Sequence, residues 1–90
     1  MGKAIVDPEE LRRFASELKR FNNELQQRLT SLQGRWRSLG ETWRDQEHKK
    51  FADEFEHTAR ALGQFVEVSN QHIPFLLRKA DRIDEYLQQR

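Results

Sequence analysis

The segment Trp36-Arg-Ser-Leu-Gly40-Glu-Thr-Trp43-Arg-Asp45 lies close to the midpoint of the chain, between two long stretches that share one apolar periodicity. Glycine commonly follows the last turn of a helix, and aspartate is a preferred N-cap residue. We interpret the segment as the tip of a hairpin in which one long helix folds back along another. Trp36 is expected to be the last large core residue of the first helix. Trp43 either folds back to close the hairpin end or protrudes as a recognition anchor.

The first helix is expected over about residues 8–39, after a flexible lead-in of residues 1–6. Asp7 can cap it, Pro8 suits the first helical position, and Glu10 stands three residues after the cap, as in a capping box. Apolar residues then recur at spacings of three and four: Leu11, Phe14, Leu18, Phe21, Leu25, Leu29, Leu32, Trp36 and Leu39. This spacing is typical of a helix that packs lengthwise against another.

The second helix is expected over about residues 43–88. Its apolar seam runs through His48, Phe51 or Ala52, Phe55, Ala59, Leu62, Val66, Ser69, Ile73, Leu76, Ala80, Ile83 and Leu87. Pro74 has no N–H and its ring crowds the carbonyl of Asn70. Because the apolar phase continues beyond Pro74, a kink is predicted there rather than a break.

Antiparallel pairing of the two seams predicts a single all-α domain over residues 1–90. In the predicted register Trp36 lies opposite His48, Leu25 opposite Ala59 and Leu11 opposite Ile73. Residues beyond about Leu77 then have no partner on the first helix and form an overhang of about 15 Å.

A second apolar stripe lies beside the seam of the second helix, where a two-helix hairpin cannot cover it. Large exposed apolar surface usually marks an interaction site. The simplest arrangement that buries it is a four-helix bundle of two hairpins, as a homodimer or as a heterodimer with a related hairpin. The candidate dimer-face residues are Phe65, Val68, Phe75, Leu77, Ile83 and Leu87.

Composition argues against several other functions. The 16 basic and 15 acidic residues nearly cancel, whereas nucleic-acid binders usually carry a basic excess. There is no cysteine, and the single Glu54-x-x-His57 faces apolar positions, so neither a metal site nor another cofactor is expected. The sequence shows no recognisable combination of a catalytic nucleophile with a general base, so an enzyme is not expected. No apolar run reaches the roughly 20 residues of a membrane span.

Residues 7–88 resemble the WXG-type, Esx-like family of small helical hairpins associated with type VII secretion. The matching turn is Trp43-Arg44-Asp45, followed by Phe51 and Phe55 on the second helix. The resemblance implies antiparallel four-helix dimers, many of which are exported folded after a secretion ATPase reads a C-terminal signal. Two positions depart from the family pattern: Asp45 replaces the glycine of the turn motif, and Arg90 stands four residues after Tyr86, where the export signal has an acidic residue.

Two functional hypotheses follow. The first is a non-enzymatic interaction protein related to type VII secretion substrates. It is either secretion-associated in the cytoplasm or secreted without a cleaved signal peptide. Its contact surfaces would be the C-terminal overhang and the bundle tips, with Trp36, Gly40, Trp43 and Asp45. The second is a cytoplasmic coiled-coil adaptor or chaperone-like protein with no secretion role, which the missing tail signal favours.

Overall fold

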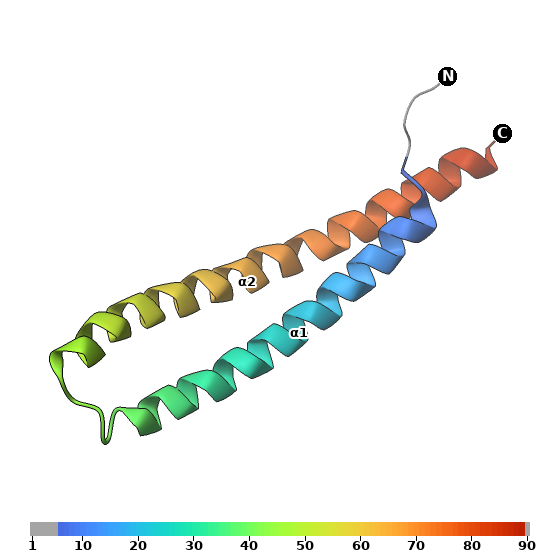
Figure 1. Ribbon diagram of the computed structural model, residues 1–90. Coiled ribbons are helices and arrows are strands. Elements are labelled where there is room, and N and C mark those ends of the chain that lie inside the picture. The colour runs from blue at the N-terminus through green and yellow to red at the C-terminus, as the bar shows by residue number, and fades with distance from the viewer. Residues whose placement is uncertain (1–5, 90) are drawn as a thin grey trace.

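The computed structural model describes residues 6–89 as two antiparallel helices, α1 (Pro8–Leu39) and α2 (Gln46–Gln88), joined by residues 40–45 (Figure 1). The hairpin is a rod with extents of 68 × 21 × 15 Å. The predicted all-α hairpin is confirmed. Of the lead-in predicted for residues 1–6, only Val6 belongs to the described residues, and its side chain is exposed.

Local capping explains where each helix begins. The carboxylate of Asp7 accepts a hydrogen bond from the Glu9 N–H at 3.0 Å, and Pro8 occupies the first helical position. Asp45 caps α2 in the same way, accepting from the His48 N–H at 3.0 Å. Both predicted caps are confirmed, and each satisfies a backbone donor that has no partner within its helix.

The connection between the helices spans residues 40–45, from the predicted stop Gly40 to the predicted cap Asp45. Gly40 ends α1 with φ −65°, and the N–H groups of Thr42 and Trp43 both donate to the Leu39 carbonyl. These turn hydrogen bonds hold residues 41–43 outside α2. The second helix therefore begins at Gln46, directly after its predicted cap Asp45 and three residues after the approximate start at residue 43.

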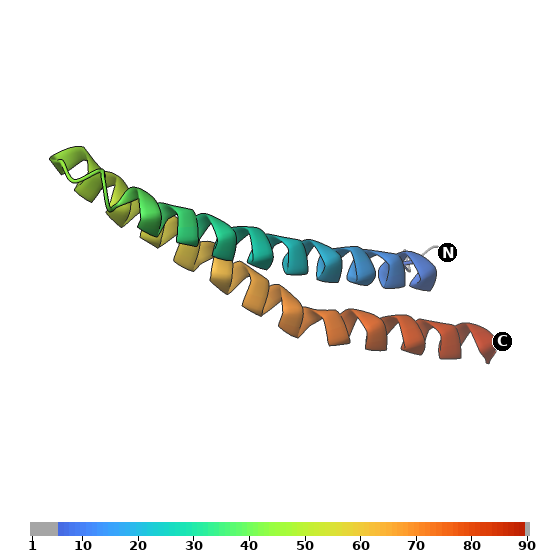
Figure 2. The same ribbon diagram turned by 90° about the horizontal axis from the view of Figure 1, so that it is seen from below.

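The second helix continues through Pro74 as predicted, because it is one element from Gln46 to Gln88. Figure 2 shows that α2 changes direction along its second half. The missing N–H of a proline is a recognised cause of such bends.

The interior of the hairpin is built mainly from small side chains. The buried residues are Ala15, Asn22, Ala59, Val66, Ser69, Ala80 and Ile83, and seam leucines such as Leu18, Leu25 and Leu62 are half-buried. Four residues that we assigned to the first seam instead face outward, with about half of their surface exposed: Phe14, Phe21, Leu32 and Leu39. Ala15 and Asn22 take the inner positions of α1 because small or short side chains let the two helices approach closely.

The predicted register is wrong along most of the hairpin. It places Asn22 opposite Leu62, whereas Asn22 hydrogen-bonds to Ser69, seven residues further along α2. At the tip, the predicted contact between Trp36 and His48 is present. The error has a physical reason: the apolar pattern repeats about every seven residues, so two seams stay in phase when they slide by one repeat.

The predicted overhang beyond Leu77 is also wrong. Arg12 of α1 bonds to Asp81 and Asp84, and Ala80 and Ile83 are buried inside the hairpin. The first turns of α2 instead project beyond the end of α1 at the tip (Figures 1 and 2). Ile83 is therefore a core residue and not part of an exposed dimer face.

Candidate functional site

Aromatic rings from both helices gather at the tip of the hairpin, in a tip cluster that consists of Trp36, Trp43, His48, Phe51 and Phe55. The ring of Trp36 stacks on His48 with centroids 4.9 Å apart and planes 6° apart. The same indole lies 5.2 Å from Phe51 and 5.0 Å from Phe55. Trp36 therefore joins the last turn of α1 to the first three turns of α2.

Trp43 folds back onto this cluster and closes the hairpin end, rather than protruding from it. Its ring meets Trp36 edge-on at 6.1 Å and His48 at 5.0 Å, and its side chain is half-buried. Asp45 sits beside it as the cap of α2. The structure thus brings all four residues predicted for the turn site, Trp36, Gly40, Trp43 and Asp45, to one end of the hairpin.

Gly40 marks a close approach between the two helix ends. A Cβ at this position would lie 3.4 Å from the Arg37 carbonyl oxygen and 3.5 Å from Nε2 of His48. These are ordinary packing distances, so the glycine leaves room without being essential. Nε2 of His48 is buried and has no hydrogen-bond partner among the described residues.

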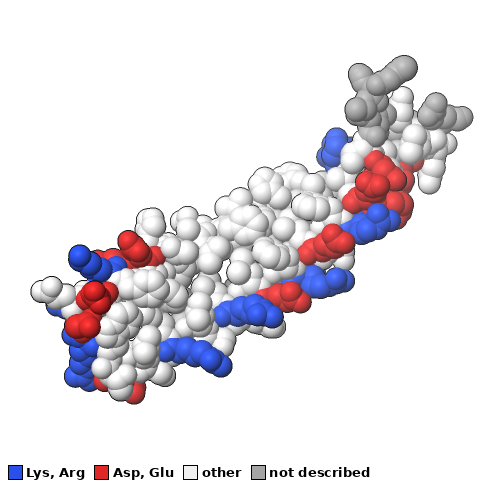
Figure 3. All heavy atoms as spheres, viewed as in Figure 1, with Lys and Arg blue, Asp and Glu red and all other residues white. Residues whose placement is uncertain are grey.

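Along the hairpin, large apolar side chains form an outer apolar face, which we define as Phe14, Phe21, Leu32, Leu39, Phe51 and Phe65. Those of α1 are spaced by seven and eleven residues, and the two of α2 by fourteen, so each set lies on one side of its helix. The rings of Phe21 and Phe65 meet edge-on at 6.3 Å, which joins the two sides into one surface. Figure 3 shows a broad face of the hairpin whose middle carries no charged side chain, while charges line one long edge and the two ends.

The six residues predicted for a dimer face divide into two groups. Ile83 is buried inside the hairpin, whereas the other five are 40–58% exposed: Phe65, Val68, Phe75, Leu77 and Leu87. Of these, Phe65 belongs to the outer apolar face, and the guanidinium carbon of Arg78 lies 4.6 Å from the ring centroid of Phe75. The sequence prediction missed the exposed residues of α1 because it assigned them to the seam. The signal that identifies them is the presence of Ala15 and Asn22 one residue further along, at positions small enough for close helix packing.

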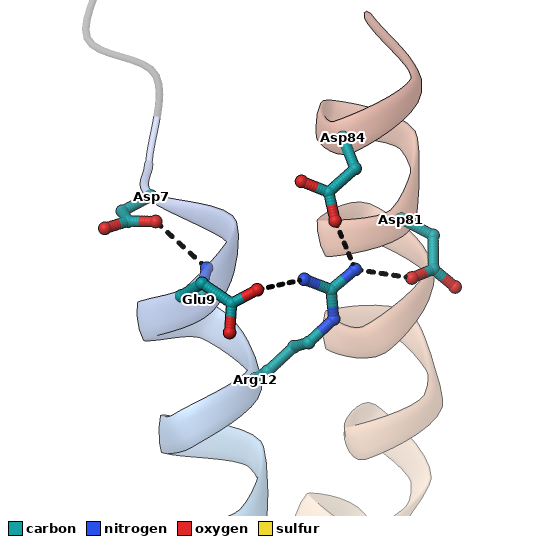
Figure 4. A network of polar contacts seen from close by, with 5 residues as sticks. All are labelled: Asp7, Glu9, Arg12, Asp81 and Asp84. Atoms are coloured by element: carbon teal, nitrogen blue, oxygen red, sulfur yellow. Dashed lines mark hydrogen bonds and ion pairs between the residues drawn. The ribbon is translucent and has the colours of Figure 1, made fainter. Parts of the chain in front are cut away.

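An ion-pair network closes the open end of the hairpin (Figure 4). Nη2 of Arg12 lies 2.7 Å from Asp81 and 2.6 Å from Asp84, and Nη1 lies 3.0 Å from Glu9. The hydrogen bonds to Asp81 and Asp84 raise the pKa of Arg12 above its ordinary value. Sequence reasoning missed this network, because it becomes visible only once the register is known.

Other kinds of site are not found in the described part of the chain. Among residues 6–89, no group of three His, Cys, Asp or Glu side chains is arranged to hold a metal ion. Over the same residues, neither helix contains a stretch apolar enough to cross a membrane. The features that remain are apolar and aromatic surfaces, which suit contact with another protein.

Comparison with known proteins gives a consistent result. The model of the WXG100 family, proteins of 100 residues with WXG, matches residues 4–86. The wild-type secreted protein EsxB from Bacillus anthracis str. Sterne superimposes with a TM-score of 0.71 at 30% identity, over 91% of this chain and 94% of that one. A mutant of the same EsxB gives a TM-score of 0.76 at 29% identity, over 94% and 96% of the two chains. No curated protein sequence gives a significant match.

Proposed function

Because the chain belongs to the WXG100 family, we propose that it works as an Esx-like interaction module whose hairpin pairs with a second copy of itself in a four-helix bundle. WXG100 proteins typically pair as dimers. The proposed function is binding through apolar surface and involves no catalysis.

The observation that carries this proposal is the contact between Phe21 and Phe65. The two rings touch across the helices, yet each keeps about half of its surface exposed. The two helices of the described residues leave them uncovered, and exposed apolar surface of this kind marks an interaction site. Burial of large aromatic side chains dominates the energetics of such interfaces.

A second copy of the chain suits this face for two reasons. The formal net charge is only +1, so two copies repel each other weakly. A two-fold interface brings the same apolar patch of both subunits together, so the phenylalanines of one face pack against those of the other. A related hairpin with a similar face is the other candidate partner.

The test of pairing is the mass in solution, measured by light scattering after size exclusion at several concentrations. We expect twice the 10.8 kDa chain mass for the wild type and a monomer for Phe21→Asp. The matched control is Gln27→Asp, which places the same charge on the exposed, polar side of α1 and should leave the dimer intact. A monomeric wild type at all concentrations would refute the homodimer.

We further propose that the protein is exported as a folded hairpin dimer. The support is its similarity to EsxB, which is described as a secreted protein. The alternative is a cytoplasmic adaptor or chaperone-like protein, and the observation that favours it is Arg90, which replaces the acidic residue of the family's export signal. Expression in a host with a type VII system should place the protein in the culture medium. Complete retention in the cell would reject export and support the adaptor.

A further inference from the structure

The seam between α1 and α2 contains one polar layer, which we define as Asn22, Ser69 and Asn70. Among residues 6–89, Asn22 is the largest side chain with no solvent exposure, and Ser69 is buried opposite it. Nδ2 of Asn22 donates to Ser69 Oγ at 2.7 Å and to Asn70 Oδ1 at 2.9 Å. Both hydrogen atoms of the Asn22 amide are therefore used, and α1 is tied to α2 halfway along the rod.

The apolar residues of the seam do not by themselves choose this alignment. Their spacings of three and four repeat about every seven residues on both helices. A register displaced by seven residues places Leu18 opposite Val66 and Leu25 opposite Ala59, which again brings apolar side chains together. Two registers, one heptad apart, are thus compatible with the apolar pattern.

Asn22 distinguishes the two registers. In the displaced register it would face Leu62, and the N–H groups of its amide would be buried without an acceptor. An unpaired buried donor is strongly unfavourable, whereas the apolar contacts are similar in both registers. Ser69 discriminates less, because its hydroxyl also bonds to the carbonyls of Phe65 and Val66 on its own helix.

We propose that Asn22 is the register-determining residue of this hairpin and acts through Ser69 and Asn70. A single buried asparagine fixes the register of some coiled coils in the same way, at a cost in stability. That cost is visible here, since Oδ1 of Asn22 is buried without a hydrogen-bond partner among the described residues.

The register also determines how the aromatic side chains of the two helices are aligned along the outer apolar face. In the structure Phe21 contacts Phe65, and displacing one helix by seven residues, about 10 Å, would change the axial offset between these two rings. Asn22 thereby shapes the outer apolar face without touching a partner. This consequence rests on the proposed function, whereas the role of Asn22 in the register does not.

The test measures the register within one chain. The sequence has no cysteine, so cysteines at the exposed positions Gln27 and Lys79 can carry spin labels, and dilution with unlabelled protein removes distances between subunits. All variants carry Arg12→Met, because the ion pairs of Arg12 also favour the observed register. In this background we compare three proteins. The first has no further change, the second carries Asn22→Leu, and the third carries both Leu62→Ser and Ser69→Leu, which moves the polar partner of Asn22 by one heptad.

The expected results differ among the three proteins. Arg12→Met alone should give one narrow distance distribution. Asn22→Leu should add a second population about 10 Å longer while helicity is kept and thermal stability is equal or higher. The double change should move the main population to the longer distance. A single short distance in the Asn22→Leu protein, or two populations with Arg12→Met alone, would overturn the proposal. Failure to dimerise would leave these distances interpretable, so the proposed function is tested separately.

Discussion

Nη2 of Arg12, in the second turn of α1, donates a 2.7 Å hydrogen bond to the carboxylate of Asp81, near the end of α2 (Figure 4). The two residues are 69 positions apart in the sequence. Their contact fixes the open end of the hairpin, as the tip cluster fixes the other end. Both ends are thus held by side chains, and the polar layer of Asn22 lies between them.

Arg12→Met should lower the melting temperature by a few degrees, because it removes ion pairs that are partly exposed and therefore of modest strength. Arg13→Met, at an exposed neighbouring position, is the matched control and should have little effect. Thermal unfolding followed by circular dichroism measures both. The difference between the two variants should shrink at high salt. An equal melting temperature for wild type and Arg12→Met in low salt would contradict this role.

The effect of Arg12→Met should not depend on pH between about pH 6 and pH 9. The pKa of Arg12 is raised in the folded chain. Its contribution is therefore fully present below the ordinary value of a guanidinium and is lost only as pH rises through the higher folded-state value. Melting curves of wild type and variant across this range should stay parallel. A difference that disappears within it would show that another group controls the contact.

Leu25→Asp should unfold the protein or dissociate its subunits. Leu25 is half-buried on the seam side of α1, and a carboxylate there would lack a partner. We expect a loss of about 2–4 kcal/mol in the free energy of unfolding, measured by urea denaturation. Glu24→Asp, at the exposed neighbouring position, serves as the control. A fully helical dimer of unchanged stability would refute the placement of Leu25.

His48→Phe should leave the protein as stable as the wild type or raise its stability by about 1 kcal/mol. Phenylalanine keeps a ring to stack on Trp36, and it removes the buried Nε2 that has no partner among the described residues. Chemical denaturation measures the change, with His57→Phe, at an exposed position on the same helix, as the control. A clear loss of stability would mean that Nε2 makes a hydrogen bond, for example to a buried water.

The helix boundaries were predictable because they depend on local chemistry. Asp7, Pro8 and Asp45 act within three residues of where they stand, and the structure uses all three as the sequence indicates. The register was not predictable from apolar spacing, since a heptad pattern matches itself again after seven residues. The positions that decide it, Arg12 and Asn22, are polar and act over 47 residues or more.

The candidate site was predictable in part for a similar reason. Trp36 and Trp43 lie close together in sequence, so their meeting at the tip follows from the turn. The sequence did not show that Phe14 and Phe21 face away from the seam, because apolar residues spaced by three and four occupy both the centre of a seam and its flank. Only the neighbouring Ala15 and Asn22 show which side of α1 faces inward.

The pair Phe21 and Phe65 provides the last prediction, a double-mutant cycle. Their edge-on contact at 6.3 Å should give a coupling energy of about 0.5–1.5 kcal/mol between Phe21→Ala and Phe65→Ala in the free energy of unfolding. Urea denaturation of the wild type, both single variants and the double variant measures it.

The control cycle pairs Phe21→Ala with Phe75→Ala, because Phe75 lies ten residues further along α2 and its ring contacts Arg78 and His72. We expect the effects of that pair to add. Each Phe→Ala change on the outer apolar face should also weaken self-association, so the cycle is measured at several protein concentrations. If the coupling of Phe21 and Phe65 persists where the protein is monomeric, it arises within the hairpin. A coupling energy of zero at every concentration would mean that the contact between Phe21 and Phe65 does not stabilise the hairpin, and would contradict its role in joining the two sides of the outer apolar face.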